Sequence, residues 1–234
     1  MNYQAVSLAL QLVEEFDPDI RIAGSDGVDF YSLSKFDKNP DRIHNLQDEI
    51  NSWCATQRSW LDAAPNATNY FLVGNHEDRL RRWLWRHPEL HGLKALSLES
   101  LFEFEKLNLV MGDKDGQEVV IDDRLVITHG SMVRKYSGYT ARGEAEKQRY
   151  SRSVMTGHTH RGGIFYTTTR DGLCQAVECF CLCSLVPEYT NSPDWQHGLV
   201  LAEVMDHYVS FDIIPFHNSM GSMLCRWRGK EYQA

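Results

Sequence analysis

Tyr70-Phe71-Leu72-Val73-Gly74-Asn75-His76-Glu77 joins a short apolar segment to a polar turn that begins at glycine. Residues 70–73 are typical of a buried strand, and residues 78–85 have a helical pattern. In open α/β sheets, such strand-to-helix turns lie at the carboxyl ends of the strands, where functional sites are usually built. The stretch therefore predicts an α/β fold with part of a site at this turn.

Three further apolar segments are each followed by polar residues. They are 20–23 with Asp26 and Asp29, 125–128 with His129, and 153–156 with His158 and His160. Strand ends on one edge of a sheet converge, so we expect these side chains to gather there. If residues 158–160 are extended, both imidazoles project to the same side, because side chains alternate along a strand.

The donor types of this set are imidazole, carboxylate and amide. They suit Mn, Fe, Zn or Ni, with Mn as the first choice here, rather than a soft-metal thiolate cage. Two such ions about 3.5–4 Å apart can clamp a phosphoryl group and activate water for its displacement. His76 can then act as general acid or stabilise the developing oxyanion.

Each motif is weak by itself. Gly74-Asn75-His76-Glu77 could be a turn in which Asn75 caps the following helix. A single His-Gly after a strand is more often a surface histidine than a ligand, and His-x-His is common. The conjunction of all three motifs, in order and at strand ends, favours a metal site.

Taken together, the motifs at 74–77, 129–130 and 157–160 resemble those of calcineurin-like metallophosphoesterases. The resemblance extends over nearly the whole chain. Within the family, the chain is similar to a branch found in phage and prophage proteins. The stretches that carry this second likeness are 29–32 with Phe36-Asp37, 85–90, 137–142, and 191–198 with Trp195.

The resemblance implies a four-layer α/β/β/α sandwich of two mixed sheets with two metals at its rim. It also implies roles for individual residues. These are Asn75, His129 and His158 on the second metal, His160 on the first, Asp26 bridging both, His76 on the scissile phosphate, and Asp29 supporting the ligands.

Two features depart from the family pattern. Ser25 stands where the Gly-Asp-x-x-Asp motif has its glycine, although Asp26 and Asp29 keep their separation. The opening Asp-x-His motif has no counterpart, because residues 2–10 resemble the helix that follows it. We therefore expect the first strand to be missing, which leaves an open slot in the sheet. The first metal would keep only Asp26 and His160 as ligands, so the chain could bind one ion in place of two.

Bulk properties indicate an ordinary soluble domain. The chain has 234 residues and a net charge of −8, which does not favour nucleic-acid binding overall. We expect a metallophosphoesterase domain over 1–215 and a docked or frayed tail over 216–234. No apolar run is long enough for a membrane span and no export signal is evident, so a cytoplasmic protein with reduced cysteines is expected.

Cys179-x-Cys181-x-Cys183 is a second cluster of metal-ligand residue types. In a strand these thiols would share one face, and together with Cys174 they could hold zinc. The spacing lacks the Cys-x-x-Cys knuckles of structural zinc sites. Buried free cysteines on a core face are therefore the favoured interpretation.

The leading hypothesis is a metal-dependent hydrolase of phosphomonoesters or phosphodiesters, with nucleic acid or a nucleotide as a candidate substrate. The alternative is a truncated or inactive relative that binds a metal or a phosphate without turnover. A third reading is a nucleic-acid-binding module that uses the arginines of 79–86, although a solvated helix face explains them equally well. The sequence indicates neither the substrate-binding residues nor the oligomeric state.

Overall fold

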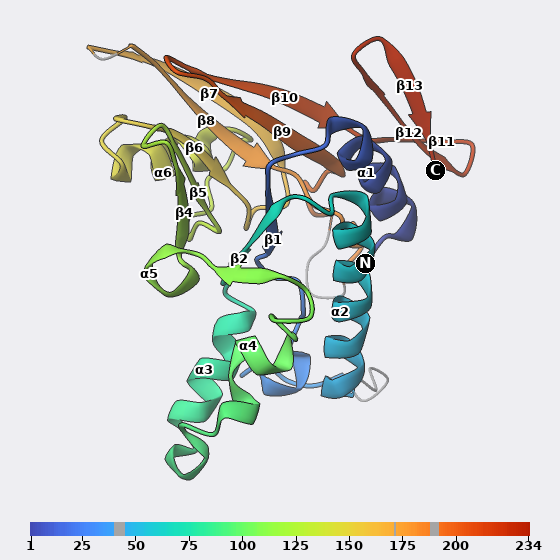
Figure 1. Cartoon of the computed structure of the whole chain (residues 1–234), viewed down its shortest axis with the longest axis vertical. Coiled ribbons are helices and arrows are strands. Elements are labelled where there is room, and N and C mark those ends of the chain that lie inside the picture. The colour runs from blue at the N-terminus through green and yellow to red at the C-terminus, as the bar shows by residue number, and fades with distance from the viewer. Residues whose placement is uncertain (40–44, 171, 188–191) are drawn as a thin grey trace. The chain divides into compact units, whose positions relative to one another are not determined.

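The stretch around Gly74 lies in a three-stranded parallel sheet (Figure 1). The computed structural model describes residues 1–39, 45–170, 172–187 and 192–234. These form two compact units, unit 1 from residues 1–16 and 118–234 and unit 2 from residues 17–117. The strands of the unit 2 sheet, in spatial order, are β1 (Ile20–Gly24), β2 (Thr68–Leu72) and β3 (Leu109–Met111).

Helices surround this sheet in unit 2. They are α2 (Leu46–Ala63), α3 (Glu77–Trp85), α4 (Leu98–Leu101) and α5 (Asp113–Gly116), with 3-10 turns η1 (Tyr31–Leu33), η2 (Pro88–Leu90) and η3 (Lys94–Leu96). Asn45 caps α2, because its side chain accepts a hydrogen bond from the Gln47 N–H.

Aromatic side chains fill the core of unit 2. The ring of Phe71 from β2 is fully buried, with ring centroids 5.7 Å from Trp53 and 5.5 Å from Phe102. Trp53 and Phe102 are themselves 4.5 Å apart. Trp53, which lies in α2, thus belongs to the core of unit 2.

Unit 1 contains a mixed five-stranded sheet. Its strands, in spatial order, are β4 (Glu118–Ile121), β5 (Leu125–Thr128), β6 (Ser153–Thr156), β8 (Gly172–Cys179) and β7 (Gly162–Thr169). The three inner strands run parallel, and both edge strands pair antiparallel. Helix α6 (Tyr139–Lys147) packs on β6 and β8, where Ala141 and Ala145 join Val154 in a fully buried cluster.

The C-terminal residues of unit 1 are folded. The remaining elements are α1 (Tyr3–Phe16), β9 (Gly198–Val204), β10 (Val209–Pro215), β11 (His217–Ser219), β12 (Ser222–Trp227) and β13 (Lys230–Gln233). Strands β11 to β13 form an antiparallel sheet whose β12 and β13 pack on α1 (Figure 1). Of the two alternatives expected for 216–234, the structure fits a docked tail rather than a frayed one, because these residues form strands that pack on α1 within unit 1. The domain boundary after residue 215 stays a prediction.

The α/β prediction is confirmed, since helices and parallel or mixed sheets occur in both units. The four-layer sandwich and the missing first strand stay predictions. No helix in the described part of the chain combines the length and the apolar character needed to cross a membrane.

Replacing Phe71 by alanine tests the aromatic core of unit 2. We expect Phe71→Ala to lower the free energy of unfolding by about 3–5 kcal/mol, because a fully buried ring leaves a cavity. Urea titration measures this change. Phe36→Ala, at a ring that is 65% exposed, is the control and should cost about 0.5 kcal/mol or less. Equal effects of the two substitutions would contradict the packing described.

Candidate functional site

The turns that follow β1 and β2 lie side by side in unit 2. The strands pair in parallel with Gly24 opposite Leu72, and the Ser25 N–H donates to the Leu72 carbonyl over 3.0 Å. Ser25 and Asp26 both have left-handed backbones, with φ of 61° and 60°. A left-handed residue at 25 explains physically why a glycine suits that position.

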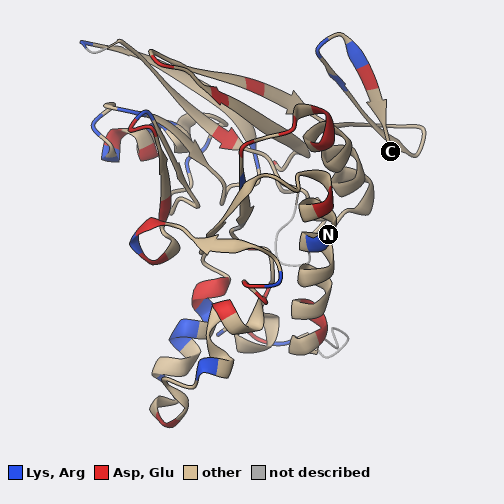
Figure 2. Cartoon of the chain, in the orientation of Figure 1, with Lys and Arg blue, Asp and Glu red and all other residues tan. Residues whose placement is uncertain are grey.

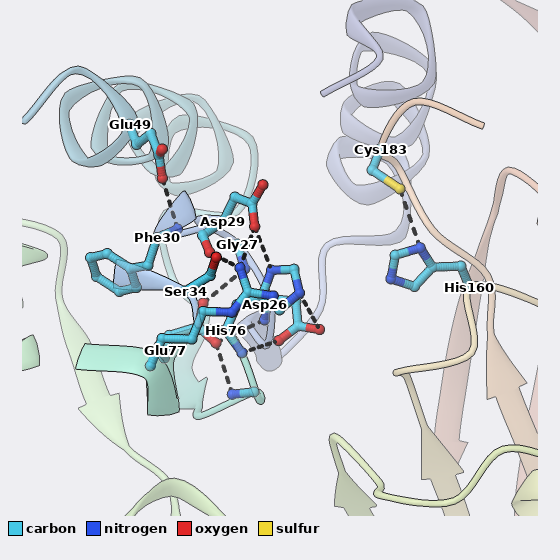
Figure 3. Close-up of polar contacts among 12 residues, drawn as sticks. Asp26, Gly27, Asp29, Phe30, Ser34, Glu49, His76, Glu77, His160 and Cys183 are labelled. Carbon is cyan, nitrogen blue, oxygen red and sulfur yellow. Dashed lines mark hydrogen bonds and ion pairs between the residues drawn. The ribbon is translucent and has the colours of Figure 1, made fainter. Parts of the chain in front are cut away.

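Glu77 holds these two turns together. Its Oε2 accepts hydrogen bonds from the N–H groups of Gly74 and Asp26, over 2.8 and 2.9 Å, and its Oε1 accepts one from Gly27 over 2.9 Å (Figure 3). The side chain is only 1% exposed. Gly74 is required by this close approach, since a Cβ there would lie 2.2 Å from Asp26 Oδ1.

Burial, and next the nearby charge of Asp26, raise the pKa of Glu77 to about 7. Backbone N–H groups of Asp26, Glu77 and Gly74 act in the opposite direction, because they stabilise the carboxylate. The desolvation of Glu77, which raises its pKa, outweighs the effect of these hydrogen bonds. Glu77 is thus a buried structural acid beside the predicted ligand Asp26.

His76 lies between two aspartates. Its Nε2 is 4.0 Å from Asp26 Oδ2, its Nδ1 is 3.5 Å from Asp29 Oδ1, and its backbone N–H donates to Asp26 Oδ1 over 2.9 Å (Figure 3). Asp29 also accepts from Arg79 over 2.5 Å. Asp29 therefore contacts the His76 ring and is fixed by an arginine, as a supporting residue requires. Asn75 is exposed in the same turn, and His76, not Asn75, occupies the N-cap of α3.

In unit 1, His129 and His158 follow the neighbouring parallel strands β5 and β6. The strands are in register, with Thr128 opposite Thr156. His129 Nε2 lies 3.0 Å from His158 Nδ1. The carbonyl of His129 accepts from the Thr156 hydroxyl over 3.0 Å, which fixes the turn after β5.

His158 and His160 do not project to the same side from an extended segment. Their φ angles are 63° and 59°, so the backbone coils after β6 and the extended interpretation is wrong. His158 meets His129, whereas His160 Nδ1 lies 3.4 Å from the Cys183 sulfur (Figure 3).

A second buried carboxylate organises this turn. Glu178 in β8 accepts from the Thr140 N–H over 3.0 Å and from the Thr159 hydroxyl over 3.3 Å. Arg161 lies 3.6 Å from it, and the same guanidinium donates to the carbonyls of Arg134 and Lys135. Both charged groups are buried, so Arg161 serves the loop and is not available to a substrate phosphate.

The cysteines near His160 are not on a strand face. Strand β8 ends at Cys179, because Phe180 has a left-handed backbone with φ 60°, and both Cys181 and Cys183 are partly exposed. The interpretation as a buried core face is therefore wrong for these two. A hydrogen bond with Cys181, reinforced by His160, lowers the pKa of Cys183 to about 4, and the pKa of Cys181 is raised.

Basic and acidic residues both occur along α3 (Figure 2), and its three arginines take part in ion pairs. Arg81 and Arg82 both pair with Asp78, and Arg79 pairs with Asp29. These ion pairs favour a solvated helix face. The alternative, a nucleic-acid-binding surface on this helix, stays a prediction.

Sequence reasoning missed the roles of Glu77, Glu178 and Cys183. Glu77 has a readable signal, since an acid three residues after Gly74 has capping-box spacing. Glu178 has another, as a charge inside an apolar strand. The contact of Cys183 with His160 depends on the bend at Phe180, which no local pattern announces. Residue 191, the first of the stretch 191–198 that carries the family likeness, lies outside the described residues.

No family model matches the chain, and a search of curated proteins finds no match either. The structure places Asp26, Asn75 and His76 on unit 2 and His129, His158 and His160 on unit 1. Within the units it brings together Asp26 with His76 and His129 with His158.

Removing the Glu77 carboxylate should destabilise unit 2. We expect Glu77→Ala to lower the free energy of unfolding by about 2–4 kcal/mol at pH 5, because three backbone donors lose their acceptor. Chemical denaturation of the metal-free protein measures it. Glu89→Ala, at an exposed acid, should change stability by about 0.5 kcal/mol or less. A Glu77→Ala protein as stable as the Glu89→Ala control would contradict the role.

The stabilisation by Glu77 should fall as pH rises. Since its pKa is about 7 in the folded chain and near 4.5 when unfolded, the unfolded state releases its proton first between these values. The stability difference between parent and Glu77→Ala should be full below pH 4.5, shrink up to about pH 7, and then level off. Unfolding titrations across this range, without metal, measure the difference. A difference that grows with pH has the wrong sign for this environment.

Proposed function

We propose that the chain is a metal-dependent phosphoester hydrolase of the calcineurin-like kind, similar to the phage and prophage branch. Mn²⁺ is the first choice of metal, and Fe, Zn and Ni suit the same donors. A phosphodiester, in nucleic acid or a nucleotide, is the proposed substrate class. The proposed ligands are Asp26, Asn75, His129, His158 and His160, with His76 as the catalytic residue.

The observation that carries the proposal is the pairing of His129 with His158. Their ring nitrogens are 3.0 Å apart at the ends of two parallel strands. Two imidazoles on one ion, at bond lengths of about 2.1 Å, have nitrogens about 3.0–3.4 Å apart, depending on the coordination geometry. The donor set and its spacing therefore fit a shared divalent ion.

The environment of His76 fits a proton donor at a phosphoester. Asp26 and Asp29 lie within 4.0 Å of its ring nitrogens, and Arg79 holds Asp29 in place. A carboxylate next to each nitrogen orients the ring. His76 can then protonate the leaving oxygen. Bound divalent ions supply polarisation of the phosphate oxygens and activation of water.

Hydrolysis of aryl phosphate mono- and diesters with added Mn²⁺ tests the proposal. We expect turnover by the parent chain, and a loss of kcat/KM of about 100-fold or more in Asn75→Ala and His158→Ala, since each removes a metal ligand. His91→Ala and Asn66→Ala, at exposed positions outside the site, are matched controls and should keep the parent activity.

Two results would count against the assignment. If Asn75→Ala and His158→Ala hydrolyse as fast as the parent, the ligand set is wrong. If the parent binds Mn²⁺ tightly yet hydrolyses neither ester class, a protein that binds metal or phosphate without turnover replaces the hydrolase. The position of His160 beside Cys183 supports this second candidate, because His160 then has a sulfur neighbour in place of the carboxylate that the hydrolase site requires.

A further inference from the structure

His160, Cys181 and Cys183 bring three metal-ligand atoms together within unit 1. The imidazole nitrogen and the two sulfurs all lie within 4.8 Å of one another. All three side chains are partly exposed, so the cluster can be reached from solvent. The other cysteines, Cys54, Cys174 and Cys225, are buried, and Cys179 is not part of the cluster.

The separation of His160 from Cys183 fits a tetrahedral ion. His160 Nδ1 and Cys183 Sγ are 3.4 Å apart (Figure 3). Zinc bonds of about 2.0–2.1 Å to nitrogen and 2.3 Å to sulfur, at the tetrahedral angle, give a nitrogen–sulfur edge of about 3.6 Å. Small side-chain rotations suffice to bring both atoms onto one ion.

Backbone hydrogen bonds hold the segments that carry these ligands. The Gln196 N–H donates to the His160 carbonyl over 2.9 Å, and the Cys181 N–H donates to the Gln196 carbonyl over 3.1 Å. The His197 ring, through Nε2, bonds the Cys183 carbonyl over 2.7 Å. Residues 196–197 thus tie His160 to the cysteine segment, as outer-shell groups do in metal sites.

We propose that His160, Cys181 and Cys183 form a zinc-binding site with a fourth position left for water or another small ligand. Two thiolates and one imidazole are a soft donor set that zinc accepts, in contrast to the His and Asp residues of the proposed hydrolase. The site needs neither phosphoester hydrolysis nor any residue of unit 2. It stands independently of the proposed function, although His160 belongs to both ligand sets.

Cobalt spectroscopy tests the site. The metal-free, reduced full-length chain is titrated with Co²⁺, whose thiolate-to-metal charge-transfer band in the near ultraviolet reports sulfur ligation. We expect the band to appear with one Co²⁺ per chain and to be displaced by Zn²⁺. Cys181→Ser and Cys183→Ser should each weaken zinc binding on the order of 100-fold and reduce the band.

Two controls separate this site from the hydrolase ligands. Cys179→Ser changes a neighbouring thiol outside the cluster, and His129→Ala removes an imidazole of the hydrolase set; both should retain the band. A parent chain without the band, or a band unchanged in both Cys181→Ser and Cys183→Ser, would overturn the zinc site. If His129→Ala loses hydrolysis but keeps the band, the zinc site is supported independently of the hydrolase ligands.

A measurement on the unmodified chain covers the case in which a variant fails to fold. The thiols are alkylated with and without bound Zn²⁺ and mapped by mass spectrometry. We expect zinc to protect Cys181 and Cys183 selectively. Equal labelling of these two cysteines in both samples would exclude zinc ligation by sulfur.

Discussion

The buried side chain of Glu77, hydrogen-bonded to the turns that follow β1 and β2, is the interaction on which these turns of unit 2 depend. Its two oxygens accept hydrogen bonds from the backbones of Gly74, Asp26 and Gly27. Such donors, at strand ends and away from water, need an acceptor, and an ionisable side chain is a costly one to bury. The cost is offset because one group orders two turns. Asp26, whose backbone N–H is held by Glu77, in turn accepts a hydrogen bond from the backbone N–H of His76.

Unit 1 uses the same physical solution with different residues. Glu178 lies fully buried in β8 and accepts hydrogen bonds from Thr140 at the start of α6 and from the loop residue Thr159, with Arg161 as its countercharge. Glu144 in α6 accepts from the Ser131 N–H over 2.9 Å and holds the turn after His129. Buried acids therefore support the strand-end loops of both units. A buried ion pair is weak evidence for stability, but here each partner also satisfies backbone groups. Glu178 accepts from the N–H of Thr140 in α6, and Arg161 donates to the carbonyls of Arg134 and Lys135 in a loop.

The sequence predicts those parts of this arrangement that depend on local pattern. Strand ends and their polar residues are readable because burial alternates with turns that need glycine, as at Gly74. Buried Met223, Cys225 and Trp227 also alternate along β12 with Leu224 and Arg226, and this period of two was equally readable. The contact of His160 with Cys183 was not readable. It depends on left-handed residues, including Phe180, where backbone direction is set by tertiary packing.

The separation of His158 from His160 has a chemical consequence that no single motif expresses. One histidine faces another imidazole, and the next but one faces sulfur. Nitrogen donors alone discriminate poorly among divalent ions, whereas added thiolates select softer ions such as zinc. His158 and His160, two residues apart in the sequence, are therefore suited to different metal ions. In the zinc site that we propose, Cys181 and Cys183 add two sulfur ligands to His160, and both follow the backbone bend that ends β8.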